Sequence, residues 1–267
     1  MKVLPIYQVD AFTNELFGGN PAAICPVKEM LSDELMQRIA LENNLSETAF
    51  ISGADGHYHI RWFTPGTEVS LCGHATLAAS YVIRHELGDQ SAELSFESLS
   101  GVLKVRFIED SIELDFPAAS YTREPIPEEV AKQLPFEALD SRFNRDDLLI
   151  VAPDEETVAS LELDFTGLKN SRVRGVVISA RSERMDVDFV SRWFGGPEVG
   201  IKEDPVTGSA HTLLTPYWSE LLGKKTLKAE QISQRLGQLE CEWTEDRVLL
   251  RGSAVLYLKG QITVSGG

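Results

Sequence analysis

The stretch Ala75-Thr-Leu-Ala-Ala-Ser-Tyr-Val-Ile-Arg-His-Glu-Leu87, followed by Gly88, decides the fold of this 267-residue chain. It predicts a helix that is apolar on nearly every side until its last turn. Such a pattern is typical of a helix buried inside a sheet or barrel. The surrounding sequence consists mostly of short β-rich runs, so the chain is expected to have an α+β fold in which strands surround a central helix.

The second half of the chain repeats this arrangement. The run Gly73-His-Ala-Thr-Leu77 leads into the first helix, and Gly208-Ser-Ala-His-Thr-Leu213 leads into a second helix predicted to end near Leu222. The two glycines are 135 residues apart, close to half of the chain. A repeat of this length predicts two similar β-barrel-like halves, each wrapped around one central helix.

A polar, proline-dotted stretch after Pro117 marks the expected domain boundary. It gives an N-terminal domain over 1–116 and a C-terminal domain over 117–267, with a return of the last strand to the first domain left open. Short turns at 55–56 and 109–110 predict hairpins and therefore largely antiparallel pairing. Further helices are expected over 33–42 and 128–134. Strands are expected over 6–12, 22–27, 48–51, 57–63, 92–97, 103–108, 112–116, 148–152, 173–180, 186–194, 240–244, 247–251, 254–258 and 261–264.

The composition argues against several classes of protein. Hydrophobic residues make up 43% of the chain, so it has enough apolar surface for a sizeable core. Asp and Glu number 41 against 25 Lys and Arg, and the net charge of −16 disfavours nucleic acid as a partner. No run approaches the ~20 apolar residues of a membrane span, and no signal-type segment opens the chain, so a soluble cytoplasmic protein is expected. Three cysteines without a C-x-x-C pair argue against disulfides or structural zinc.

The starts of the two central helices are candidate binding sites for a carboxylate. Unpaired N–H groups and the positive end of the helix dipole favour anions at Gly73-His74-Ala75 and at Gly208-Ser209-Ala210. At a single helix, ordinary capping is the better explanation of such residues. Two such ends facing one cleft would hold an acidic substrate despite the negative charge of the whole chain.

Two acids are candidates for proton transfer. Glu47 stands where a helix passes into an apolar strand, and burial there would raise its pKa toward the range of a general base. The alternative is a solvated residue at a strand end. Asp204 precedes Pro205 four residues before Gly208, and its alternative role is to start an Asp-Pro turn.

His74 and Cys72 are the remaining candidates at the first helix start. His74 could donate a hydrogen bond or relay a proton. The helix N-terminus would lower the pKa of Cys72 and make it a nucleophile or an acid/base, whereas burial would make it inert packing. His57 and His59 point to one face of a strand without an evident third ligand, so no metal site is expected.

Missing motifs narrow the chemistry further. The sequence has no Gly-x-Gly-x-x-Gly after a strand, no Gly-Lys-Ser/Thr phosphate loop, no Gly-x-Ser-x-Gly elbow and no His-Glu-x-x-His. Dinucleotide-dependent, nucleotide-hydrolysing, serine-hydrolase and zincin functions all lose support. We therefore expect acid/base chemistry without a cofactor.

Five motifs, in this order, resemble the PhzF-like isomerases of the phenazine-biosynthesis family, relatives of diaminopimelate epimerase. They are Gln8-Val-Asp-Ala-Phe12, Phe17-Gly-Gly-Asn-Pro-Ala-Ala23, Asn43-Asn-Leu-Ser-Glu-Thr-Ala-Phe50, Leu71-Cys-Gly-His-Ala-Thr76 and Glu203-Asp-Pro-Val-Thr-Gly-Ser-Ala-His211. The resemblance implies two barrel-like halves with the site in the cleft between them, and commonly a homodimer. In the phenazine enzyme a glutamate moves a proton from a ring carbon of dihydro-hydroxyanthranilate to another position, without metal or cofactor.

The resemblance also implies roles for individual residues. Glu47 matches the acid/base, and Asp204, His74 and Ser209 match its polar partners. Gly73, Gly208 and Asn20 fall in motifs that line the cleft and are expected to bind substrate. We therefore predict a cofactor-independent isomerase that moves a proton between carbons of a small carboxylate.

Two alternatives stay open. One is an epimerase or racemase that uses Cys72. The resemblance implies that the epimerase relatives of this family use two cysteines, one at the start of each central helix. In this sequence the start of the second helix carries Asp204 and Ser209 instead of a cysteine. The other alternative is a metabolite-binding protein without turnover. The identity of the substrate is open in each case.

Overall fold

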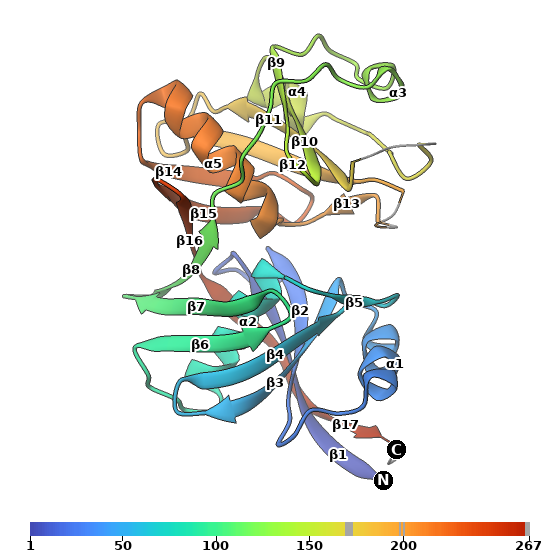
Figure 1. Ribbon diagram of the computed structural model, residues 1–267, viewed down its shortest axis with the longest axis vertical. Helices are drawn as coiled ribbons and strands as arrows, with labels where there is room; N and C mark the ends of the chain where they lie inside the picture. Colours follow the sequence, from blue (N-terminus) through green and yellow to red (C-terminus); the bar gives the residue numbers. More distant parts are fainter. Residues whose placement is uncertain (169–172, 198, 200, 265–267) are drawn as a thin grey trace. The chain divides into compact units, whose positions relative to one another are not determined.

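A computed structural model describes residues 1–168, 173–197, 199 and 201–264. The chain divides into two compact units (Figure 1): unit 1 comprises Met1–Asp115 and Arg251–Gly267, and unit 2 comprises Phe116–Leu250. The chain enters unit 2 within β8 (Ser111–Pro117) and leaves it within β16 (Arg247–Gly252). Residues 251–264, whose place the sequence left open, are therefore part of unit 1.

Unit 1 contains a mixed sheet. Its remaining strands are β1 (Lys2–Ala11), β2 (Asn20–Pro26), β3 (Glu47–Ala54), β4 (His57–Phe63), β5 (Glu68–Val69), β6 (Glu93–Ser98), β7 (Gly101–Ile108) and β17 (Ala254–Val264). The pairs β2–β3 and β4–β6 are parallel. The pairs β1–β17, β1–β2, β3–β4, β4–β5, β6–β7 and β7–β8 are antiparallel. The hairpins predicted at 55–56 and 109–110 are present, with Asp55, Gly56 and Glu109 at positive φ.

Two helices pack on the strands of unit 1. The central helix α2 (Gly73–His85) contacts β1, β2, β3 and β17. It begins two residues before the predicted start and buries most of its surface, as its nearly all-round apolar pattern requires. Helix α1 (Asp33–Asn43) buries only Met36, Ile39 and Ala40, which join a separate core cluster with residues of β1, β2 and β3.

Unit 2 also contains parallel and antiparallel strand pairs. Its strands are β9 (Asp140–Phe143), β10 (Asp147–Val151), β11 (Gly175–Arg181), β12 (Phe189–Gly195), β13 (Glu203–Asp204), β14 (Thr226–Gln231), β15 (Gly237–Thr244) and β16. Its helices are α3 (Glu128–Ala131), α4 (Glu155–Ala159) and the central helix α5 (Gly208–Leu222), which packs on β10, β14 and β15.

The two units repeat one topology. From β1 to β7 the pairings are antiparallel, parallel, antiparallel, parallel and antiparallel, with β5 attached antiparallel to β4. From β9 to β15 the same sequence of pairings recurs, with β13 attached antiparallel to β12. In both units the central helix follows the two-residue strand and begins at a glycine, Gly73 or Gly208. The starts of α2 and α5 are therefore equivalent places in the fold.

The helices of the described residues are all too short or too polar to cross a membrane.

Candidate active site

Unit 1 gathers four of the predicted or candidate site residues. Asn20 is the first residue of β2 and Glu47 the first residue of β3, and because these strands are parallel their starts lie at the same edge of the sheet. Cys72 is the N-cap of α2 and His74 its second residue. Parallel pairing and the helix start together bring these polar side chains to one place.

A tight turn before β2 fixes the position of Asn20. Gly19 has a φ of +58°, and a Cβ at this position would lie 2.1 Å from the carbonyl oxygen of Ala11. Only glycine combines this backbone conformation with so close an approach. The turn leaves the Asn20 side chain fully buried, with its Nδ2 atom 3.3 Å from Nδ1 of His74.

The His74 ring lies between an acid and a thiol. Its Nε2 atom is 3.0 Å from Oε2 of Glu47, and its Nδ1 atom is 3.6 Å from Sγ of Cys72. Burial disfavours a charge on the ring, but Cys72 and Glu47 outweigh it and hold the pKa of His74 well above its ordinary 6.5. Because the amide of Asn20 donates to Nδ1, the neutral ring carries its proton on Nε2, facing Glu47.

Glu47 and His74 form an ion pair when the ring is protonated. Within the described part of the chain, neither Oε2 of Glu47 nor Nε2 of His74 has a well-aligned hydrogen-bond partner, although both atoms are buried. Buried polar atoms are normally satisfied, so this pair is suited to an additional group that exchanges a proton with it.

Cys72 differs from the expectation for a thiol at a helix N-terminus. Burial, followed by the charge of Glu47, raises its pKa to about 11, and the opposing effects of His74 and the Ala75 N–H are smaller. Of the two roles considered for Cys72, inert packing is favoured, because desolvation exceeds the effect of the helix end. Cys72 is a neutral thiol that contacts His74.

The same three side chains also have metal-ligand chemistry. One ligand-type atom from each of Glu47, Cys72 and His74 lies within 4.8 Å of the others. However, Glu47 faces Nε2 of the ring and Cys72 faces Nδ1, and a single metal ion bonds only one of the two ring nitrogens. The arrangement suits proton transfer through the ring better than a metal centre.

Unit 2 holds Asp204 in a buried polar network at the start of α5. Its carboxylate accepts a hydrogen bond from the hydroxyl of Thr207, the N-cap of α5. Gln231, which is fully buried, donates to the Asp204 carbonyl at 2.8 Å and accepts from the Thr207 backbone N–H at 2.8 Å. Two side chains, those of Thr207 and Gln231, therefore hold Asp204 in place.

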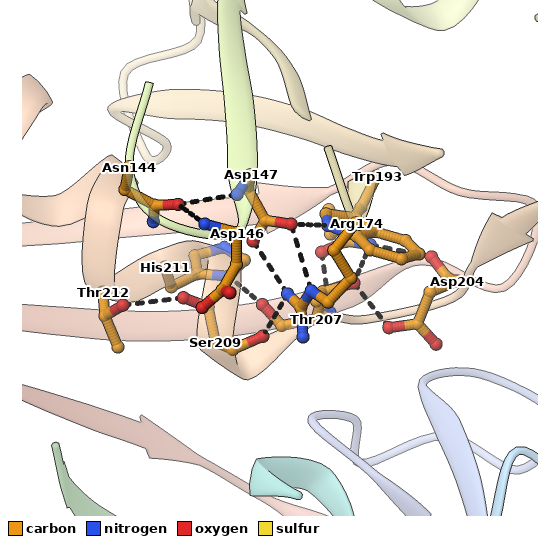
Figure 2. Close-up of polar contacts among 11 residues, drawn as sticks. Asn144, Asp146, Asp147, Arg174, Trp193, Asp204, Thr207, Ser209, His211 and Thr212 are labelled. Carbon is orange, nitrogen blue, oxygen red and sulfur yellow. Dashed lines mark hydrogen bonds and ion pairs between the residues drawn. The ribbon is translucent and has the colours of Figure 1, made fainter. Parts of the chain in front are cut away.

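Ser209 lies beside a cation that the sequence had not indicated (Figure 2). Nη2 of Arg174 donates to Oγ of Ser209 at 2.9 Å and to Oδ2 of Asp147 at 2.8 Å, while Nε donates to Oδ1 of Asp147 at 3.2 Å. Nε1 of Trp193 also donates to Oδ1 of Asp147 at 3.2 Å. Burial raises the pKa of Asp147, against the opposing effect of Arg174.

Arg174, Asp147, Trp193 and Gln231 are the site residues that sequence reasoning missed. A usable signal existed, because Asp147 and Arg174 are charged residues that enter apolar strands, the pattern that singled out Glu47. Arg174 thus adds a positive charge at the start of α5.

The structure therefore places the predicted residues in two groups. Asn20, Glu47, Gly73 and His74 lie together in unit 1, with Cys72 beside them. Asp204, Gly208 and Ser209 lie at the start of α5 in unit 2. Their roles, and their action on one substrate, stay predictions.

Comparison with known proteins decides the family. The sequence profile of the PhzC-PhzF family, described as phenazine biosynthesis-like protein, matches residues 9–260. This chain belongs to the PhzF family. The resemblance seen in the five motifs is thereby confirmed.

Relatives with similar full-length chains agree with the assignment to the PhzF family. An uncharacterized isomerase of Pseudomonas aeruginosa is 51% identical over 97% of this chain and 98% of its own. The crystal structure of a PhzF-family protein of Enterococcus faecalis is 44% identical, with a TM-score of 0.92 over 98% of this chain and all of the other. Because curated relatives are named isomerases, this PhzF-family chain is an isomerase.

A more distant structure shares the fold. A hydroxyproline epimerase from Agrobacterium vitis aligns over 97% of this chain and 92% of its own, with a TM-score of 0.58 at 10% identity. This likeness concerns the fold alone. It confirms the predicted α+β class and places this PhzF-family chain among folds related to the epimerases.

Proposed function

We propose that the protein moves a proton between two carbons of a small carboxylate without a cofactor, with Glu47 as the acid/base. The observation that carries the proposal is the buried ion pair between Oε2 of Glu47 and Nε2 of His74 at 3.0 Å. A general base must reach the proton that it removes and must then be able to return it. A carboxylate whose neighbour can itself take up or release a proton is suited to both steps.

In the proposed reaction, the Glu47 carboxylate removes a proton from a carbon next to an unsaturated or carbonyl group. The electron pair of the broken C–H bond moves into that group, giving an enolate-like anion. The Glu47 carboxylic acid then protonates a different carbon, which restores the carboxylate and shifts the double bond. N–H groups in the first turn of α2 favour negative charge there, where fixed donors are most effective.

His74 would hold the reacting acid in position. Asn20 fixes the ring from the Nδ1 side and leaves Nε2 toward Glu47. The raised pKa of the ring lets it hold a proton beside Glu47 and share it during the reaction. We propose also that the strands of each unit close around α2 or α5 as a barrel-like half. The homodimer and the cytoplasmic location stay predictions.

Solvent-deuterium incorporation tests the proposal. Fractions of small carboxylates from a cell extract are first screened for one that raises the melting temperature of the protein. The protein is then incubated with that fraction in D2O, and mass spectrometry measures the deuterium in the recovered carboxylates. We expect Glu47→Gln to reduce incorporation about 10²-fold or more. Glu42→Gln is the matched control, because Glu42 is exposed on α1. Equal incorporation by wild type and Glu47→Gln would refute the role of Glu47.

The two alternative functions give different results in the same experiment. A metabolite-binding protein would be stabilised by the extract fraction but would incorporate no deuterium. An epimerase dependent on Cys72 would lose incorporation when Cys72 is replaced by Ala. The neutral, buried thiol favours the glutamate mechanism over this alternative.

A further inference from the structure

The equivalent places in the two units carry different chemistry. At the edge where β3 begins in unit 1, Glu47 faces His74, the second residue of α2. At the edge where β11 begins in unit 2, Arg174 faces Ser209, the second residue of α5. The acid Glu47 in unit 1 thus corresponds to the cation Arg174 in unit 2, and the titratable ring of His74 corresponds to the hydroxyl of Ser209. The first pair can exchange protons, whereas the second pair can only hold a charge.

The Arg174 guanidinium is fixed on one side and open on the other. Nε and Nη2 form a two-point contact with Asp147, which is 1% exposed, and the guanidinium lies 5.3 Å from the centre of the Trp193 ring. In the part of the chain that the structure describes, Nη1 has no hydrogen-bond partner, and 40% of the Arg174 side chain is exposed. Two N–H donors are therefore available on a guanidinium whose orientation is already set.

Arg174 also sets the direction of the Ser209 hydroxyl. Because Nη2 donates to Oγ at 2.9 Å, the oxygen acts as an acceptor toward Arg174, and its own hydrogen must point away from the guanidinium (Figure 2). Ser209 is half-buried at the helix start, so this hydrogen is available to an acceptor from outside the chain. The pair thus offers two donor atoms, Nη1 of Arg174 and Oγ of Ser209, and one positive charge.

We propose that Arg174 and Ser209 form an anion-recognition site that takes a carboxylate group, with Asp147 and Trp193 as positioning residues. A planar carboxylate presents two oxygens to two donors, and charge-assisted hydrogen bonds of this kind are roughly twice as strong as neutral ones. The inference rests on the proposed function, in which the substrate is a small carboxylate. It adds the residue that selects for the charge.

Equilibrium binding of benzoate and benzamide to the full chain tests this site. The two probes have similar shapes but only benzoate is charged, and Trp193 provides a reporter because its indole N–H contacts Asp147. We expect benzoate, but not benzamide, to shift the Trp193 indole signal in ¹⁵N-¹H spectra. The same spectra with Trp193→Phe identify the signal.

The variants separate recognition of the charge from folding. Replacing Arg174 alone would leave Asp147 buried and unpaired, so the double variant Asp147→Asn/Arg174→Met is used. We expect it to weaken benzoate binding by about tenfold or more, the effect of losing a charge-assisted hydrogen bond. Arg174→Lys, which keeps the charge without the planar fork, should recover part of the affinity. Arg184→Met is the matched control, because Arg184 is ion-paired in unit 2 and its side chain is 41% exposed.

Several results would overturn the inference. Benzoate and benzamide binding equally well would overturn it, and so would unchanged benzoate binding by the double variant. The same holds if the wild type does not respond to tens of millimolar benzoate, or if it binds inorganic phosphate more tightly than benzoate. Glu47→Gln separates this inference from the proposed function, because it should bind benzoate like the wild type. If Glu47→Gln keeps full deuterium incorporation, the proposed function fails while the binding result stands.

Discussion

Nε2 of His74 lies 3.0 Å from Oε2 of Glu47, and Nδ1 of the same ring faces Asn20 and Cys72. The ring therefore has a charged neighbour on one nitrogen and neutral neighbours on the other. Its protonation depends on Cys72 and Glu47, because burial alone disfavours the imidazolium. This dependence can be measured without knowing the substrate.

Glu47→Gln should lower the pKa of His74. The variant removes the negative charge 3.0 Å from Nε2, so that only Cys72 still opposes burial, which favours the neutral ring. Titration of the ring by NMR measures the change, and Glu42→Gln should leave the pKa of His74 unchanged. An unaltered pKa in Glu47→Gln would contradict the charge coupling on which the proposed mechanism depends.

The same coupling predicts the sign of a stability change. A raised pKa in the folded state means that the protonated ring stabilises the fold below the ordinary value of 6.5, and that this contribution is lost as pH rises through the raised pKa. As the pH rises from below 6.5 through the raised pKa of His74, the free energy of unfolding should therefore fall less in Glu47→Gln than in the wild type. Urea unfolding at several pH values measures this difference.

The cysteines should resist alkylation in the folded protein. Burial raises the pKa of Cys72 to about 11 and that of Cys25 and Cys241 to about 12, so very little thiolate is present at pH 8. Mass spectrometry after iodoacetamide treatment should find no label in the native chain and labels on all three cysteines in urea. Rapid labelling of Cys72 with loss of deuterium incorporation would favour the epimerase alternative.

The sequence predicted the central helices well because their signals are local. The apolar pattern and the leading glycine of each helix lie within one continuous segment, and α2 and α5 begin within two residues of their predicted starts. The strand β14 was missed because Thr226–Gln231 mixes charged and apolar residues. Helix α4 was missed although Asp154 caps it by accepting from the Thr157 N–H, a signal that was present but attached to only five residues.

The candidate site was predictable only in part, for a related reason. The family motifs single out Glu47, His74, Asp204 and Ser209 as residues, without saying which of them touch. Arg174 and Asp147 belong to none of the five motifs. Their contact results from the parallel pairing of β10 with β11, which sets Asp147 opposite Gly175. Pairing between strands so far apart in sequence is decided by the tertiary fold rather than by local preference.

Gly175→Ala should loosen the Arg174 site. A Cβ at Gly175 would lie 2.2 Å from the Trp193 ring, so the ring must move and its hydrogen bond to Asp147 must weaken. Overpacking of this kind costs about 1–3 kcal/mol, which urea unfolding can measure. Gly167→Ala is the control, because no atom of the described residues lies within 4 Å of a Cβ there. Benzoate binding should weaken in Gly175→Ala alone, and equal stability of the two variants would argue against this packing.

His211→Gln should make the fold less sensitive to acid. His211 is fully buried in α5 near Phe189, and its Nδ1–H donates to the Thr207 carbonyl at 2.9 Å. Burial lowers its pKa from 6.5 to about 4. Between pH 6.5 and pH 4, His211 takes up a proton in the unfolded chain but stays neutral in the folded chain. The free energy of unfolding therefore falls as the pH falls. The difference corresponds to about 3 kcal/mol near pH 4.

Glutamine can donate to the same carbonyl but does not titrate, so the variant lacks this loss. Urea unfolding at neutral pH and near pH 4 should therefore show a smaller drop in stability for His211→Gln than for the wild type. His57→Gln, at an exposed ring, serves as the control and should follow the wild type. Equal drops for wild type and His211→Gln would mean that the folded state accepts the proton on His211, which requires α5 to open near its first turn.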